Sequence, residues 1–198
     1  MNPGSEFNPL TFRGERQQSP DLSGIQIGHC ERYFFAAKQV RGSVLDAACG
    51  CGYGSKIMHD TGAMVTGIDL EPEAIEYARR HYPGPEYILA DVGKYRGRYE
   101  WVVSFETLEH LPDPRPALER FRESKRLIIS TPNEEHYPFN PEKFQGDKFP
   151  HVRHYRPAEL DELLASVGFG VVSRHCQESK GSRVTDGTAG MFILYVCV

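Results

Sequence analysis

Long apolar runs are missing from this sequence of 198 residues. No stretch approaches the roughly 20 residues that a membrane-spanning helix needs. Cysteine is sparse, with five scattered residues and no C-x-x-C pair, which favours reduced thiols in the cytoplasm over a disulfide framework. An excess of positive charge is also absent, because the formal net charge is −4. The totals therefore give no support for binding an extended nucleic acid.

The length suits one domain with a sizeable core. Residues 1–28 are polar and turn-rich, and they lack the basic start and apolar middle of a signal peptide. We therefore expect an amino-terminal arm or flap over residues 1–28 and a single domain over residues 29–198.

Apolar segments of two periodicities alternate along the chain, which predicts seven strands and five helices. Alternation of this kind is typical of a Rossmann-like α/β fold, in which helices cover both faces of a mostly parallel, doubly wound sheet. The last two strands have no helix between them, so we expect the final strand to be antiparallel and near one edge. The predicted strands are 43–50, 64–70, 86–92, 99–106, 126–133, 170–175 and 191–198, and the predicted helices are 30–40, 53–60, 72–82, 113–124 and 157–169.

Acidic residues end four successive predicted strands. They are Asp46, Asp69, Asp91 and Glu106. A single such acid is usually a helix cap or a solvated turn. Four at one edge indicate a site, because ligands of open parallel sheets bind outside the carboxyl ends of the strands.

The stretch VLDAACGCGYGS, residues 44–55, places three glycines shortly after Asp46. Glycines let the backbone approach a ligand closely, but their G-x-G-x-G spacing differs from the G-x-G-x-x-G pattern of dinucleotide sites. A carboxylate at Asp46 would repel a pyrophosphate and attract a ligand with an ammonium and a sulfonium group. The stretch therefore predicts a positively charged ligand.

From about residue 29 onward, the sequence resembles the class I S-adenosylmethionine-dependent methyltransferases. VLDAACGCG is similar to that family's first motif, with Ala48 where glycine is commoner, and VTGIDLEPEAIEYAR, YILADV and WVVSFETLEHLPDP are similar to its later motifs. The resemblance implies an enzyme that takes its methyl group from S-adenosylmethionine. It also implies a donor site with Asp46 and Gly50 at the methionine part, Asp69 at the ribose, and Leu70, Asp91 and Val92 at the adenine, together with Tyr33, Ala48, Gly52 and Phe105.

Within that class, the chain is most similar to bacterial methyltransferases associated with small molecules and glycans. The shared patterns include Phe12 to Arg16, His29 to Ala36 and the H-V-R that begins at His151. This resemblance implies a small-molecule or sugar acceptor, such as a nucleotide-sugar, methylated on oxygen, although transfer to nitrogen stays open. Where the family often has glutamate after H-V-R, this chain has His154.

The long irregular stretch 131–156 exceeds ordinary connection lengths. Together with the arm, it is expected to form a lid over the acceptor. Its basic residues Lys143, Lys148 and Arg153 either contact an anionic acceptor or are ordinary surface charges.

The segment ETLEHLPD carries candidates for catalysis. On a helix, Glu106, Glu109 and His110 would share one face. Three interpretations are open. The residues are simply the solvated start of a helix, or a histidine, His110 or a loop histidine such as His151, accepts the acceptor's proton. In the third, Glu106, Glu109 and His110 bind a divalent metal ion together with His151 or His154. The metal interpretation rests on a partial similarity to metal-dependent 2′-O-methyltransferases of small RNA, and E-x-x-E-H also occurs in ubiquinone-pathway O-methyltransferases. A non-catalytic S-adenosylmethionine-binding regulator is a further alternative.

Overall fold

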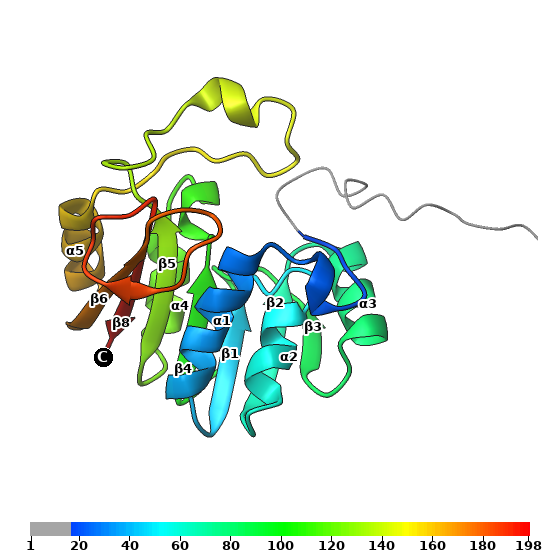
Figure 1. Cartoon of the computed structure of the whole chain (residues 1–198). Coiled ribbons are helices and arrows are strands. Elements are labelled where there is room, and N and C mark those ends of the chain that lie inside the picture. The colour runs from blue at the N-terminus through cyan, green and yellow to red at the C-terminus, as the bar shows by residue number, and fades with distance from the viewer. Residues whose placement is uncertain (1–16) are drawn as a thin grey trace, which may run out of the picture.

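The computed structural model describes residues 17–198, in which eight strands form one sheet in the order β3-β2-β1-β4-β5-β8-β6-β7 (Figure 1). The strands are β1 (Ser43–Ala47), β2 (Met64–Asp69), β3 (Glu86–Leu89), β4 (Trp101–Phe105), β5 (Leu127–Pro132), β6 (Val171–Gln177), β7 (Thr185–Asp186) and β8 (Phe192–Cys197). All seven predicted strands are present. The additional strand, β7, has only two residues and pairs with β6 inside a loop that the sequence marks as polar.

The sheet has the predicted mixed direction. Strands β1 to β5 pair in parallel, while β8 is inserted antiparallel between β5 and β6. This insertion follows from the missing helix between the last two long strands, because only an antiparallel pair can be joined by a short connection. The Rossmann-like, mostly parallel fold is confirmed.

Helices cover both faces of the sheet (Figure 1). Within the described residues they are α1 (Ile27–Gln39), α2 (Tyr53–His59), α3 (Pro72–His81), α4 (Arg115–Phe121) and α5 (Pro157–Ser166). Successive strand residues enter opposite cores, so Val44 packs in the core of α1, α2 and α3, whereas Leu45 packs in that of α4 and α5. No helix among the described residues is long and apolar enough to cross a membrane.

Helix α1 begins at Ile27, inside the arm that the sequence predicts to end at residue 28. Residues 1–16 of that arm, including the stretch from Phe12 to Arg16, lie outside the described residues.

The segment 133–156 crosses above the carboxyl ends of the strands, where Figure 1 shows it in yellow-green and yellow. Its one short helix is the 3-10 helix η3 (Pro141–Phe144). The segment is tied down at its carboxyl end, because the Val152 amide donates to the Glu109 carbonyl at 2.7 Å and Asn133 pairs with Tyr155. It therefore stands where the predicted lid would stand.

Candidate functional site

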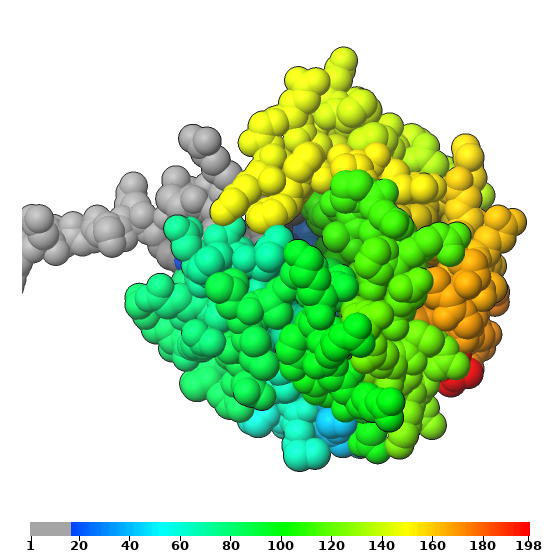
Figure 2. Space-filling model, turned by 180° about the vertical axis from the view of Figure 1, so that it is seen from behind, coloured from blue at the N-terminus to red at the C-terminus, as the bar shows by residue number. Residues whose placement is uncertain are grey.

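A cavity of about 460 Å³ opens at the carboxyl ends of the central strands. Figure 2 shows the segment 133–156, in yellow, overhanging a hollow above the green and teal surface. Most of the predicted donor-site residues line this cavity: Tyr33, Ala48, Gly50, Asp69, Leu70, Asp91, Val92 and Phe105. Residues from four strand ends therefore share one cavity, as the sequence predicts.

Asp69 is placed by backbone hydrogen bonds at the end of β2. Its Oδ2 accepts from the Gly50 amide and its Oδ1 from the Glu71 amide, both at 2.9 Å. The side chain is 1% exposed, so the carboxylate cannot turn away from the cavity that it lines. A carboxylate can accept several hydrogen bonds at once, which is the chemistry that a ribose diol requires.

Asp91 follows β3 in a more open position. Its Oδ1 accepts from the Gly93 amide at 2.8 Å, and Lys94 Nζ lies 3.3 Å from its Oδ2. Because the side chain is 36% exposed, its charge is screened by water and by this ion pair.

Asp46 differs from its predicted position, because it lies beneath the cavity and does not line it. The residue has no exposed surface; its Oδ1 accepts from the Tyr33 hydroxyl at 3.2 Å and its Oδ2 from Ser55 Oγ at 2.6 Å. Burial raises the pKa of Asp46 to about 7. The carboxyl therefore holds α1 and α2 to β1, and it contacts the lining of the cavity through Tyr33.

The turn after β1 needs unusual backbone angles. Ala48 has φ 63°, which is unfavourable for a residue with a Cβ and explains why glycine is commoner there. Gly52 has φ 89° and does not line the cavity; a Cβ at this position would lie 2.6 Å from Ala78 Cβ. Gly52 thus permits close packing of α2 on α3, and its predicted contact with the donor stays a prediction.

Glu106 is not on a helix with Glu109 and His110, contrary to the sequence interpretation. The structure has only a short 3-10 helix, η2 (Leu108–His110), and Glu106 precedes it with φ 50°. Backbone pairing to β5 imposes this angle, since the Glu106 amide donates to the Ser130 carbonyl and its Oε1 accepts from Ser130 Oγ at 2.7 Å. Glu106 lines the cavity, but it does not belong to the cluster that the other candidate metal ligands form.

Glu109, His110 and His151 form one cluster, in which one ligand atom of each lies within 4.8 Å of the others. His110 and His151 line the cavity, and their rings meet edge to face at 4.6 Å, while Glu109 is fully buried behind them. His154 is not in this cluster. The structure thus unites three of the four predicted metal ligands and both predicted catalytic histidines.

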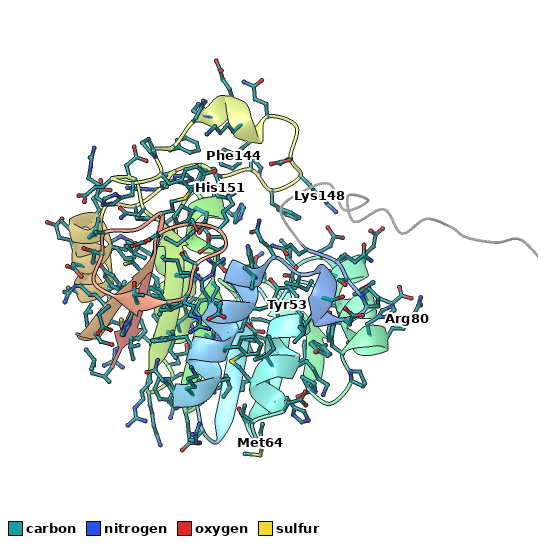
Figure 3. The ribbon with its side chains drawn as sticks, viewed as in Figure 1. Tyr53, Met64, Arg80, Phe144, Lys148 and His151 are labelled. Carbon is teal, nitrogen blue, oxygen red and sulfur yellow. The ribbon has the colours of Figure 1, made fainter. Side chains whose placement is uncertain are left out.

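His151 is held by its neighbours on the segment 133–156. Its ring stacks on Phe144 at 4.1 Å, and its Nδ1 lies 2.9 Å from His154 Nε2. The Nδ1 of His154 lies 2.6 Å from the Tyr137 carbonyl oxygen and therefore donates to it. Figure 3 shows Phe144 and His151 close together on this segment, with Lys148 farther toward α3.

None of the three predicted basic contacts lines the cavity. Lys148 pairs with Glu71, Arg153 lies 3.6 Å from Glu159, and Lys143 lies over the ring of Tyr137. Sequence analysis instead missed Lys180, which does line the cavity, along with His29, Tyr137, Phe149 and Phe192. The aromatic residues of the segment 133–156 could have indicated that this long loop packs against the domain, because apolar rings favour burial. Lys180 had no local signal.

The fold is that of a class I S-adenosylmethionine-dependent methyltransferase. The family described as "Methyltransferase domain" matches residues 29–174, and the chain belongs to it. It is an enzyme that uses S-adenosylmethionine as methyl donor.

The relatives of this chain are also described as methyltransferases. A probable S-adenosylmethionine-dependent methyltransferase of Mycobacterium tuberculosis is 30% identical over 194 residues, which cover 89% of this chain and 67% of the relative. A ubiquinone biosynthesis O-methyltransferase of Nitrosospira multiformis is 32% identical over 57% of this chain and 46% of its own length. Among solved structures, a TehB-like S-adenosylmethionine-dependent methyltransferase from Corynebacterium glutamicum has the same fold, with a TM-score of 0.61, 22% identity, and coverage of 85% of this chain and 86% of that one.

Proposed function

We propose that this enzyme methylates a hydroxyl group of a small molecule, and that His151 and His110 handle the proton of that hydroxyl. The observation that carries the proposal is the pair of imidazoles in the cavity beside Glu106, at the β4 and β5 side of the sheet. The acids Asp69, which ends β2, and Asp91, which follows β3, lie at the other side. An acceptor between the two sides would meet a base and a methyl donor together.

The chemistry of the pair suits this role. The activated donor needs an aligned nucleophile, and a hydroxyl becomes a better nucleophile when a base accepts its proton. An imidazole has a pKa near working pH, which makes histidine a usual choice. The relatives named ubiquinone biosynthesis O-methyltransferase also transfer to oxygen, as their name states, which supports a hydroxyl acceptor.

The cluster also fits a divalent metal ion. One buried carboxylate and two imidazoles form a donor set that suits transition metals. Glu109, His110 and His151 would hold the ion, which would polarise the acceptor hydroxyl. The metal mechanism leads to the same reaction, methyl transfer to a hydroxyl, but it predicts that a chelator abolishes activity.

The test is a panel of hydroxylated and amino acceptors, including phenols, sugars and nucleotide-sugars, with methylated product measured by mass spectrometry. With any acceptor that is methylated, His151→Ala should lower kcat about a hundredfold while the S-adenosylhomocysteine dissociation constant stays within about twofold. The control is His136→Ala, an exposed histidine of the same segment that does not line the cavity. Product on nitrogen alone, or an unchanged kcat in His151→Ala, would refute the proposal. Loss of activity with a chelator, restored by a divalent ion, would support the metal version.

A further inference from the structure

Arg32 in α1 is a buried charge with few partners. Its side chain is among the largest fully buried ones, at 1% exposure. Its Nη1 donates to Gln177 Oε1 at 2.6 Å and its guanidinium lies 4.8 Å from the centre of the Phe192 ring, while its Nε and Nη2 have no hydrogen-bond partner. No carboxylate among residues 17–198 forms an ion pair with it. Because buried charges are normally paired, an anion in the neighbouring cavity would stabilise Arg32, although Arg32 does not itself line that cavity.

Lys180 is a second cation in the same region, and it lines the cavity. Its carbonyl accepts from the Gly28 amide at 3.1 Å, which fixes the loop after β6 against the start of α1. Its Nζ lies 5.8 Å from the centre of the Tyr137 ring. Within the described part of the chain, Lys180 has no ion pair with a carboxylate.

The two cations lie over neighbouring rings. The rings that they contact, Tyr137 and Phe192, lie 6.2 Å apart and both line the cavity. His29 also lines the cavity. Its pKa is lowered well below the ordinary value, mainly by burial and to a smaller extent by the charges of Arg32 and Lys180. Among residues 17–198, no carboxylate forms an ion pair with either cation, so this part of the cavity favours an anion.

The Lys180 end of the positive region lies on the β5 and β8 side of the sheet, whereas His29, 3.1 Å from the Tyr53 hydroxyl, adjoins the glycine turn. Phe192 begins β8, which pairs with β5, and Tyr137 follows β5 in the chain. Asp69 and Asp91 follow β2 and β3 at the other end of the sheet order. The cavity thus has an acidic half that suits a cationic donor and a basic half at the acceptor side.

We infer that Lys180, with Arg32 behind it, forms a subsite for an anionic group of the acceptor, a carboxylate or a phosphate. The inference rests on the proposed function, because it takes the β5 and β8 side to be the acceptor side. The ammonium of Lys180 would contact the anion directly, and the guanidinium of Arg32 would stabilise it across the Phe192 ring. The acceptor is then an anionic molecule whose hydroxyl reaches His151 while its charge is held at Lys180.

The probe for this subsite is inorganic phosphate, titrated into the full-length enzyme saturated with S-adenosylhomocysteine, with binding followed by NMR. Phosphate should bind saturably, Lys180→Gln should weaken it about tenfold, and Lys180→Arg should keep it within about threefold. The matched control is Lys143→Gln, because Lys143 also lies over the Tyr137 ring, at 5.4 Å, but does not line the cavity. Arg32→Lys keeps the buried charge and should retain binding, whereas Arg32→Met should lose it; thermal unfolding shows whether each variant is folded.

Two results would overturn the inference. One is phosphate binding that is absent or the same in Lys180→Gln as in the unaltered enzyme. The other is that Lys180→Gln weakens S-adenosylhomocysteine but not 5′-methylthioadenosine, which lacks the amino-carboxylate part; the cations would then serve the donor's own carboxylate. Phosphate binding needs no turnover, so an enzyme that binds phosphate at Lys180 yet methylates only nitrogen would refute the proposed function and leave the subsite intact.

Discussion

The cavity has two proposed halves, a donor half around Asp69 and an acceptor half around His151, and different kinds of contact hold them in place. In the donor half, Asp69 is fixed by amides of the two turns beside it, from Gly50 and Glu71. In the acceptor half, His151 is fixed by side chains of a long segment, through stacking on Phe144 and contact with His154. Backbone hydrogen bonds follow from strand ends and glycine turns, whereas side-chain stacking depends on how the whole segment folds back. The donor half should therefore be rigid before any ligand binds, and the acceptor half should adapt.

The largest predicted effect concerns Asp46, the buried acid beneath the donor half, which contributes to the stability of the fold. Burial raises the pKa of Asp46 to about 7, while an unfolded aspartate titrates near 3.9. The folded state thus binds the proton more tightly, so the stability from this group is fully present below about pH 4 and is lost as the pH rises to about 7. Over that range, the loss is about 4 kcal/mol.

Asp46→Asn should remove this pH dependence and keep partners for Tyr33 and Ser55. Urea unfolding measured from pH 4.5 to 8 would show the variant gaining stability relative to the unaltered enzyme as the pH rises. A stability difference that is independent of pH would mean that Asp46 is ionised in the fold at every pH tested, and that the donor half contains a fixed negative charge after all.

The next effect compares two acids of the donor half. Asp69→Ala should weaken S-adenosylhomocysteine binding by at least ten- to a hundredfold, because each hydroxyl bond to the carboxylate is worth about 1.5–3 kcal/mol. Asp91→Ala should cost only a few-fold, since Asp91 is more exposed and already paired with Lys94. Calorimetric titration of both variants decides the order, and equal losses would contradict the contrast in burial on which it depends.

The same division explains what could be predicted from the sequence. The strands, and the meeting of Gly50, Asp69 and Asp91 at one cavity, were predictable, because short apolar runs, acids at strand ends and glycines are local signals. The two exceptions are instructive. Gly52 has a packing role that depends on Ala78, and Asp46 is covered by Tyr33 and Ser55, neither of which is adjacent to it in the sequence.

The acceptor half was predictable only as a set of residue types. The histidines were identified from E-x-x-E-H and H-V-R. The predicted helix that includes Glu106 is absent, because the Glu106 amide pairs with the Ser130 carbonyl and Glu106 has a positive φ. Lys180 could not have been found, since its place depends on a carbonyl bond to Gly28, about 150 positions earlier in the chain. Long-range contacts of this kind have no signature in one sequence.

The smallest predicted effect concerns the link between the two halves. Lys148 of the segment 133–156 pairs with Glu71, which follows the donor residues Asp69 and Leu70, and Phe149 beside it lines the cavity. Glu71 is nearly buried while Lys148 is 57% exposed, so the pair is worth at most about 1 kcal/mol. Lys148→Ala should therefore raise the dissociation rate of S-adenosylhomocysteine about two- to fivefold, and high salt should reduce the difference, as stopped-flow measurements would show. Lys143→Ala is the control, because Lys143 lies on the same segment and has no ion pair with the rest of the described chain. If Lys148→Ala left the rate unchanged at low salt, the segment would be held over the donor by its aromatic packing alone, and the acceptor half would be as rigid as the donor half.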